Sequence, residues 1–362
     1  MALPEAFERY IEDNRLLAPD DRVLLTVSGG VDSMVMLRLF ARGGYRIGVA
    51  HCNFQLRGAE SDEDEVLVAD EAAQLGVPCY NRRFDTLAEM ERTGESMEMA
   101  ARRLRYAWFE ELCREHGYTA VAVAHHADDS IETFFINLLR GTGLRGLTGI
   151  STQAGRIVRP LMFASRKEIL EYAVAEKIPF REDSSNRSTK YLRNKIRLGL
   201  IPRIREINPK FTALMQRNIG HLTDAQLFID HGIERIRREA VVEHDGIHTI
   251  RLDRIDPAFP RAFVIYELLS SAYGFKGDVI DALCRALDQQ ATGKRFYARE
   301  HVAHVDRGTI AVAPIPDDDE CLIPVEQGAA RSYCGNAVLY YEYLDIDTIE
   351  DFGVPEQIAQ VD

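Results

Sequence analysis

The chain has 362 residues, enough for two or three domains, and its 46% hydrophobic and 28% charged residues are typical of a globular protein. No apolar run reaches the roughly 18 residues of a membrane-spanning helix, and the first residues lack a signal-peptide pattern. The six cysteines form no C-x-x-C pair, which argues against a zinc ribbon, a cysteine-held cluster and a disulfide scaffold. We therefore expect a cytoplasmic protein.

The net charge of −13 is unevenly distributed along the chain. Residues 317–362 contain 12 acidic residues and one arginine, whereas residues 181–210 contain nine lysines and arginines and three acidic residues. A locally basic surface is therefore available, and the acidic net charge does not exclude a nucleic acid as partner.

The N-terminal half alternates between two kinds of pattern. Apolar runs typical of strands lie at residues 22–27, 45–51, 77–84 and 118–125. Patterns typical of helices cover residues 34–40, begin near Ser61, and cover residues 95–116 and 130–139. This alternation predicts an α/β fold with a parallel sheet that is buried on both faces.

After residue 202 the pattern changes. We expect helices over residues 208–240 and 261–288 with a short strand pair near 248–252, two strands within 295–313, and a last strand over 337–344. The predicted domains are an α/β domain (1–207), a mostly helical domain with a small β element (208–316), and an acidic linker with the start of a truncated C-terminal domain (317–362).

The string Ser-Gly-Gly-Val-Asp-Ser at residues 28–33 joins the first strand to a helix. Gly29 and Gly30 allow the backbone to curl around an anion, and the helix N-terminus presents unpaired N–H groups to it. There is no Walker-type lysine. A plain strand–turn–helix connection explains the glycines but not the whole string, so we predict a phosphate site.

Asp128 and Asp129 follow the fourth predicted strand, at the edge where open α/β sheets bind ligands. Adjacent carboxylates can hold Mg²⁺ against triphosphate oxygens, or one can take a proton from an amine. Two other interpretations exist for this segment. The aspartates are also typical of a helix N-terminal cap, and His125-His126-x-Asp-Asp could bind zinc, although the H-E-x-x-H spacing is absent.

Basic and aromatic residues on the later helices have two interpretations each. Arg102, Arg103 and Arg105, like the basic stretch at residues 187–205, could form a solvated face or contact phosphates. We expect Tyr106, Trp108 and Phe109 to belong to the core rather than to stack on bases, and Cys52 to serve packing.

Nine strings, in this order, together resemble the tRNA(Ile)-lysidine synthetase family of N-type ATP pyrophosphatases, the PP-loop superfamily. They are SGGVDS at 28–33, HCNFQLR at 51–57, ARRLRYAWF at 101–109, HHADDSIET at 125–133, LRGTG at 139–143, RPL at 159–161, SRKEI at 165–169, EDSSN at 182–186 and YLRNKIR at 191–197. One departure is Phe54, where the family often has a second histidine. That departure weakens any role for an imidazole at this position.

The resemblance implies an adenine nucleotide alpha hydrolase-like, Rossmann-like catalytic domain and a tRNA-modifying ligase. ATP would adenylate the C2 oxygen of the wobble cytidine in the isoleucine tRNA that carries a CAU anticodon. The ε-amine of L-lysine would then attack C2 and displace AMP, leaving lysidine. ATP and Mg²⁺ would be the cofactors, residues 208–316 would contact tRNA, and a homodimer would be the assembly.

The resemblance also assigns roles to individual residues. Asp32, Asp128 and Asp129 would be catalytic, with Asp32 and Asp129 on the metal. One of the two adjacent aspartates would be the base, and we favour Asp129 over Asp128. The nucleotide would be bound by Ser28, Gly29, Gly30, Val31, Asp32, Ser33, His51, Asn53 and Arg103. Lysine or tRNA would be bound by Glu132, Arg140, Arg193, Asn194 and Arg197. Arg193 and Arg197 could contact tRNA phosphates or line the catalytic pocket.

Three other functions share parts of this pattern. A PP-loop tRNA thiolase would need cysteines for sulfur transfer or for an iron–sulfur cluster, and no C-x-x-C is present. A non-catalytic nucleotide- or tRNA-binding module would not need the complete set of serines and aspartates. A GMP-synthetase-like amidating ligase would fit the loop, but it has no use for the basic stretch.

Overall fold

The computed structural model describes residues 2–181, 192–315, 331–334 and 337–340. It divides into two compact units, residues 1–229 and 230–362, and the division falls within helix α10 (Phe211–Ala240). The predicted domain boundary at residue 207 lies instead where α9 (Ile201–Ile207) ends. The three predicted domain ranges stay a prediction. Within the described residues, no helix is both long and apolar enough to cross a membrane.

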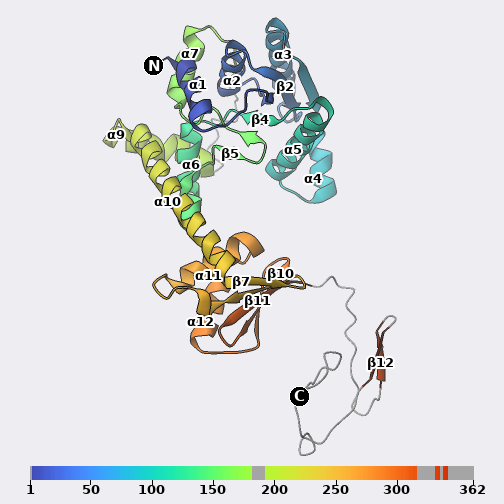
Figure 1. Cartoon of the computed structure of the whole chain (residues 1–362). Coiled ribbons are helices and arrows are strands. Elements are labelled where there is room, and N and C mark those ends of the chain that lie inside the picture. The colour runs from blue at the N-terminus through green and yellow to red at the C-terminus, as the bar shows by residue number, and fades with distance from the viewer. Residues whose placement is uncertain (1, 182–191, 316–330, 335–336, 341–362) are drawn as a thin grey trace, which may run out of the picture. The chain divides into compact units, whose positions relative to one another are not determined.

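The first unit is built on a six-stranded sheet in the order β3-β2-β1-β4-β6-β5 (Figure 1). Its strands are β1 (Arg22–Thr26), β2 (Arg46–Asn53), β3 (Cys79–Arg83), β4 (Ala120–Val123), β5 (Gln153–Ala154) and β6 (Ile157–Val158). All neighbouring pairs are parallel except β5 with β6. The predicted parallel sheet is therefore confirmed.

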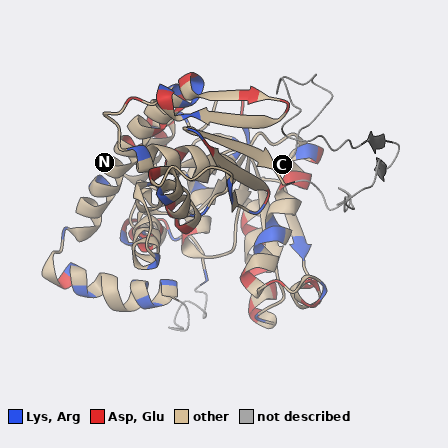
Figure 2. Cartoon of the chain, turned by 90° about the horizontal axis from the view of Figure 1, so that it is seen from below, with Lys and Arg blue, Asp and Glu red and all other residues tan. Residues whose placement is uncertain are grey.

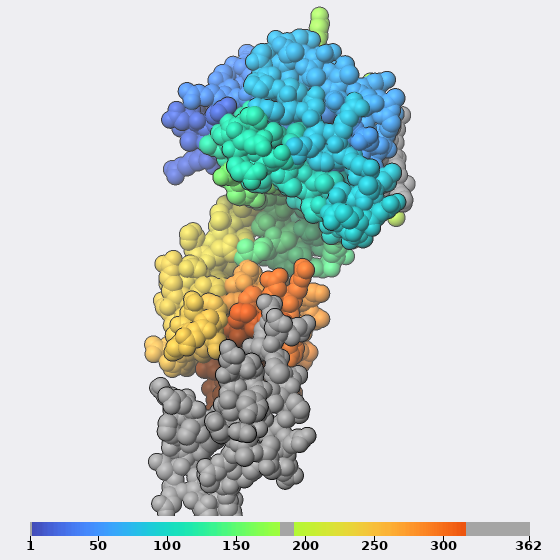
Figure 3. Space-filling view, turned by 90° about the vertical axis from the view of Figure 1, so that its right-hand side faces the viewer, coloured from blue at the N-terminus to red at the C-terminus, as the bar shows by residue number. Residues whose placement is uncertain are grey.

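Helices cover both faces of this sheet, as the alternating pattern predicts. They are α1 (Leu3–Asp13), α2 (Val31–Arg42), α3 (Ala59–Gln74), α4 (Thr86–Thr93), α5 (Met97–His116), α6 (Ala127–Arg140) and α7 (Arg166–Ala175). Blue and cyan residues, those of the first third of the chain, form most of the surface of this unit in Figure 3.

The central strand β1 shows why both faces are apolar. Val23 and Leu25 pack into the cluster that contains the buried residues of α2, whereas Leu24 packs against Trp108 and Phe109 of α5. Side chains alternate between the two faces of a strand, so a strand covered on both sides needs an unbroken apolar run. Trp108 and Phe109 are thus core residues, as predicted.

A helical segment completes the first unit. It consists of η1 (Leu144–Thr148), α8 (Leu192–Lys195), the π-helical turn η3 (Ile196–Leu200), α9 and the first half of α10. Ile196 and Ile201 pack with Ile131 of α6 and with Met215 and Ile219 of α10. This apolar contact brings residues 192–217 next to the start of α6.

The second unit contains an antiparallel sheet in the order β7-β8-β11-β10-β9. Its elements are β7 (Val241–His244), β8 (Ile247–Arg251), η4 (Leu252–Arg254), α11 (Arg261–Tyr273), α12 (Gly277–Asp288), β9 (Lys294–Tyr297), β10 (His301–Asp306) and β11 (Thr309–Pro314). A separate hairpin pairs β12 (Arg331–Cys334) with β13 (Ala337–Tyr340).

Two expectations for this unit need correction. The single helix expected over residues 261–288 is two helices, because Gly274 adopts a left-handed φ of +73° that ends α11. The two strands expected within residues 295–313 are three, because the chain turns back twice between residues 297 and 309. Acidic and basic residues are interspersed on the described elements of the chain (Figure 2).

Candidate active site

The string at residues 28–33 forms a tight loop at the carboxyl end of β1. The Ser33 hydroxyl accepts a hydrogen bond from the Ser28 amide (3.1 Å) and donates one to the Gly30 carbonyl (2.9 Å). Gly29 has a φ of +90°, which strains any residue with a side chain. Gly30 is the N-cap of α2, and Val31 begins the helix, so the unpaired amides of its first turn adjoin the loop. This arrangement suits a phosphate group.

A cavity of about 270 Å³ opens beside the loop and reaches between β1, β2, β4 and α5. The residues that line it include Ser28, Gly30, Asp32, Ser33, Cys52, Phe54, Arg102, Arg105, Tyr106 and His125. Burial raises the pKa of Cys52 to about 12, so the thiol stays protonated at neutral pH. Cys52 therefore serves packing, as the sequence predicted.

The arginines of α5 separate into two faces. Arg102 and Arg105 line the cavity, and the Arg105 guanidinium lies 5.2 Å from the centre of the Phe54 ring. Arg103 points toward α4, where its guanidinium pairs with Glu89 (2.7 Å) and with Glu95 (3.0 Å). Residues three apart share a helix face, whereas the next residue lies about 100° around it.

The structure therefore does not bring Arg103 to the loop. Sequence reasoning assigned nucleotide binding to Arg103 and missed Arg102 and Arg105 as lining residues. The spacing of three between Arg102 and Arg105 was a usable signal, but it could not show which face of the helix meets the sheet edge.

His51 and Asn53 lie at the end of β2, and each is held by specific partners. The His51 ring nitrogen Nδ1 donates to the Val27 carbonyl (2.8 Å), and Nε2 is buried without a partner among the described residues. Burial lowers the pKa of His51, which favours the neutral ring. The Asn53 amide donates to Asp62 (3.0 Å) and Glu65 (2.8 Å). Asn53 thus holds the first turns of α3. His51 has one ring nitrogen without a hydrogen-bond partner among the described residues.

Asp32, His126 and Asp129 form a compact cluster at the carboxyl edge of the sheet. His126 Nε2 lies 3.7 Å from Asp32 Oδ2 and 3.5 Å from Asp129 Oδ2. Asp129 also accepts a hydrogen bond from the His126 amide (3.1 Å), so it caps α6 as well. Sequence reasoning considered His126 as part of a helix cap or of a zinc site, whereas the structure places it, 2% exposed, between two predicted catalytic carboxylates.

The two carboxylates of this cluster are shifted in opposite directions. Burial raises the pKa of Asp32, although His126 and Arg166 oppose the shift. Burial also acts to raise the pKa of Asp129, but the neighbouring histidines, the His126 amide and Arg197 outweigh it, so the pKa is lowered. Asp129 is therefore ionised at neutral pH. Asp32 Oδ1 is buried and has no hydrogen-bond partner among the described residues.

Asp128 lies on the other side of His126 from this cluster. Its Oδ2 accepts a hydrogen bond from the Arg166 amide at the start of α7 (2.7 Å) and lies 3.9 Å from His126 Nδ1. Its Oδ1 pairs with Arg205 of α9. Adjacent residues on a helix face different directions, which explains why Asp128 and Asp129 pair with different arginines.

Glu132 and Arg197 lie on the other side of Asp129. Arg197 donates to both oxygens of Glu132 (2.6 and 2.9 Å) and to Asp129 Oδ1 (3.1 Å). Burial raises the pKa of Glu132, and Arg197 opposes that shift. Arg193 donates to Thr133 (3.2 Å), and its Nε lies 3.7 Å from Glu132. Three of the predicted substrate-binding residues are therefore brought together.

The other two predicted substrate-binding residues, Asn194 and Arg140, are not among the residues that line either cavity. Asn194 lies in α8 between the two arginines, whereas Arg140 is exposed at the far end of α6. Asp183 and Asn186 of the EDSSN string, and most of the acidic segment at 317–362, lie outside the described residues.

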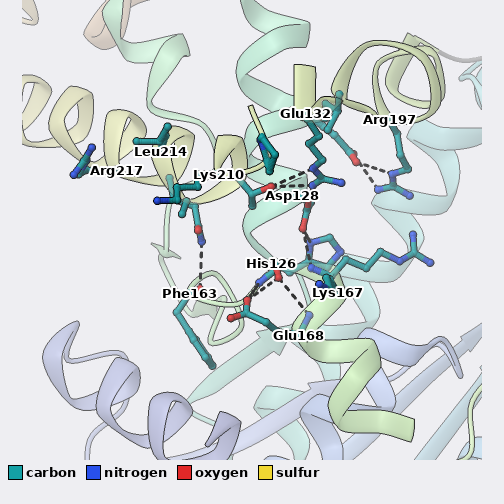
Figure 4. Close-up of a pocket in the computed structure, with 18 of the residues that line it drawn as sticks. His126, Asp128, Glu132, Phe163, Lys167, Glu168, Arg197, Lys210, Leu214 and Arg217 are labelled. Carbon is teal, nitrogen blue, oxygen red and sulfur yellow. Dashed lines mark hydrogen bonds and ion pairs between the residues drawn. The ribbon is translucent and has the colours of Figure 1, made fainter. Parts of the chain in front are cut away.

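A second and larger cavity, of about 700 Å³, lies between α6, α7, α9 and α10 (Figure 4). It is lined by side chains of both charges. The carboxylates are Asp128, Glu132, Glu168 and Glu171, and the cations are Arg166, Lys167, Arg197, Arg205, Lys210 and Arg217. His126 lines this cavity, Asp32 lines the smaller one, and their side chains lie 3.7 Å apart, so the Asp32–His126 pair lies between the two cavities.

Within the described ranges, no group of three or more His, Cys, Asp or Glu side chains could hold a metal ion. A site for Mg²⁺ does not require three protein ligands, because proteins often hold this ion with one or two carboxylates while substrate phosphates and water complete the coordination shell.

Two family models match the chain. A model described as a PP-loop domain matches residues 3–204, and one described as a TilS substrate binding domain matches residues 243–315. The tRNA(Ile)-lysidine synthase of Parabacteroides distasonis is 44% identical over 298 residues, which cover 82% of this chain and 67% of that protein. The tRNA(Ile)-lysidine synthase of Bacteroides thetaiotaomicron is 39% identical over 319 residues, covering 88% and 73% respectively.

Among solved structures, the U34-tRNA thiolase NcsA from Methanococcus maripaludis, with its 4Fe–4S cluster, superposes with a TM-score of 0.50. The sequences are 16% identical, and the match covers 61% of this chain and 78% of the thiolase. At this identity the likeness is one of fold alone.

Proposed function

Because the chain belongs to the tRNA(Ile)-lysidine synthase family, we propose that its two cavities hold the two small substrates of lysidine formation. The protein is an ATP-using PP-loop ligase that forms lysidine on tRNA(Ile). We place ATP in the smaller cavity and L-lysine in the larger one. The observation that carries this assignment is the 3.7 Å contact between Asp32, which lines the smaller cavity, and His126, which lines the larger one.

The reaction takes place in two steps on this arrangement. The C2 oxygen of the wobble cytidine in the CAU anticodon attacks the α-phosphorus of ATP, and the bond to pyrophosphate breaks. The loop at residues 28–33 binds the departing pyrophosphate and stabilises its charge. The ε-amine of lysine then forms a bond to C2, AMP leaves with the activated oxygen, and Asp129 accepts the amine proton.

Mg²⁺ fits the carboxylates of the cluster. Asp32 Oδ1 is buried and unpaired among the described residues, and Asp129 reaches the same imidazole nitrogen as Asp32. Carboxylate oxygens are the ligands that Mg²⁺ prefers, so Asp32 and Asp129 would hold the ion against the phosphates. A bound Mg²⁺ supplies charge neutralisation for the leaving pyrophosphate.

The larger cavity has the charges that free lysine requires. Lysine carries two ammonium groups and one carboxylate at neutral pH. Glu132 and Arg197 both line the cavity, so Glu132 can accept hydrogen bonds from an ammonium and Arg197 can pair with the carboxylate. Arg193 and Asp129 contact these two side chains from outside the lining. The lowered pKa of Asp129 keeps this carboxylate ionised, so its negative charge favours an ammonium beside it.

The tRNA contacts are assigned by charge and by family. We propose that the basic stretch at residues 181–210 and the matched segment at 243–315 bind tRNA(Ile). We also propose that the domains divide after residues 207 and 316. A cytoplasmic location and a homodimer remain predictions, and sedimentation of the purified protein measures the second. A tRNA thiolase has less support, because the thiolase likeness is one of fold only.

Incorporation of labelled lysine tests the proposed function. The protein is incubated with ATP, radiolabelled lysine and a tRNA(Ile) transcript that carries the CAU anticodon. We expect label in the tRNA, with one AMP and one pyrophosphate released per lysine. A transcript with uridine at the wobble position is the control and should remain unlabelled. Release of pyrophosphate without any lysine in the CAU transcript would contradict the proposal.

The arginines of α5 provide a matched pair of variants for the nucleotide cavity. Arg105→Gln removes a cation that lines the cavity, so we expect the KM for ATP to rise about tenfold, the typical effect of one lost charge-assisted hydrogen bond. Arg103→Gln removes a cation that pairs with Glu89 and Glu95 and is not among the residues that line the cavity, so its KM for ATP should stay within about twofold. Steady-state kinetics at saturating tRNA and lysine measure both values. Equal effects of the two substitutions would contradict the placement.

A further inference from the structure

Asp128 has both of its oxygens engaged by parts of the chain that form the wall of the larger cavity. Oδ2 accepts a hydrogen bond from the Arg166 amide (2.7 Å) and lies 3.9 Å from His126 Nδ1, and Oδ1 pairs with the Arg205 guanidinium. Asp128 itself is 8% exposed. A carboxylate in this position is already neutralised and hydrogen-bonded by the protein, which distinguishes it from Asp32 with its unpaired oxygen.

Arg205 extends this contact to a further helix. Its Nε and Nη2 donate to the Thr212 hydroxyl at 3.2 and 3.0 Å, in the first turn of α10. Asp128 and Arg205 therefore join α6, α7, α9 and α10, the four helices that surround the larger cavity (Figure 4).

Further ion pairs of this kind lie along α6. Glu132 binds Arg193 and Arg197, Asp129 binds Arg197, and Asp128 binds Arg205. Acidic side chains at the start of α6 thus bind arginines from residues 193–205. The apolar contacts of Ile196 and Ile201 hold this segment on α6, but apolar packing is not directional. The charged hydrogen bonds have specific geometry and can set where along α6 each arginine lies.

We infer that Asp128 is a positioning residue, which acts through Arg205 to fix α9 and so to hold Arg197 in the lysine cavity. This inference rests on the proposed placement of lysine. It gives the two adjacent aspartates different tasks. Asp129 is the proposed base, whereas Asp128, which lines the cavity, acts through Arg205 on the shape of the cavity rather than on the metal or the amine.

Separate measurement of the two half-reactions tests the inference. For Asp128→Asn we expect the KM for lysine to rise about tenfold, the scale of one hydrogen bond to a charged group. The kcat, and the formation of adenylated tRNA without lysine, should change less than about threefold. Arg205→Gln should give the same pattern. The KM for lysine of the double variant should not exceed that of the more impaired single variant, because each substitution removes the same interaction.

Asp70→Asn is the matched control, because Asp70 is exposed on α3 and should leave every constant unchanged. Circular dichroism shows whether each variant folds. Should Asp128→Asn fail to fold, Arg205→Lys carries the test, since lysine keeps the charge but cannot bridge Asp128 and Thr212 with one planar group.

Two results would overturn the inference. Loss of adenylated tRNA in Asp128→Asn would mean that Asp128 holds the metal or the nucleotide. A fall in kcat for lysine transfer at unchanged KM would mean that it is the base. A wild-type protein that adds no lysine to tRNA would instead refute the proposed function, so the two failures are distinguishable.

Discussion

The Asp32→Ala variant is expected to lose ATP-dependent pyrophosphate release almost completely while it keeps its fold. Asp32 lies in the first turn of α2, lines the smaller cavity, in which we place ATP, and has a buried oxygen without a partner among the described residues. Its removal takes a charge from the proposed metal site and takes no side chain from the apolar core. Several kcal/mol of stabilisation are typical of such metal contacts, so the rate should fall at least about a hundredfold.

Pyrophosphate release in the presence of tRNA(Ile) and saturating Mg²⁺ measures this effect. Asp20→Ala is a suitable control, because Asp20 is exposed just before β1 and lies outside both cavities. Formation of adenylated tRNA by Asp32→Ala at a rate close to wild type would show that the metal is held elsewhere.

The Asp129→Asn variant should separate the two half-reactions. Asparagine keeps the size of the side chain and an oxygen for the His126 amide, but it cannot accept the proton of the lysine amine. Adenylated tRNA should accumulate, and lysine transfer should fall by about two to four orders of magnitude, the usual range for loss of a general base. Quenched samples that are resolved for tRNA-bound AMP and tRNA-bound lysine measure both species.

Two outcomes would change this assignment. Unchanged lysine transfer would remove Asp129 from the second step. Loss of both steps, with partial recovery at raised Mg²⁺ concentration, would show that its main task is to bind the metal. Arg197→Gln is an informative companion variant, because Arg197 holds both Glu132 and Asp129 and its loss should raise the KM for lysine in particular.

The features that the sequence determined by itself are local ones. The loop at residues 28–33 is formed by two glycines and two serines between a buried strand and a helix, and its hydrogen bonds connect residues at most five positions apart. The apolar run of β1 requires cover on both faces, which already implies a parallel sheet between helices. The position of Asp128 and Asp129 at a strand end follows from the same pattern.

The tertiary structure decided which neighbouring side chains share a site. Arg103 and Arg105 are two positions apart on α5, yet Arg103 pairs with Glu89 of α4 and Arg105 lines the smaller cavity. Asp128 and Asp129 are adjacent, yet they bind Arg205 and Arg197 respectively, which come from more than 60 residues further along the chain. A helix rotates each successive side chain by about 100°, so its role depends on what the fold packs against that face. The sequence pattern shows how side chains are distributed around a helix, but only long-range packing determines which residues each of them contacts.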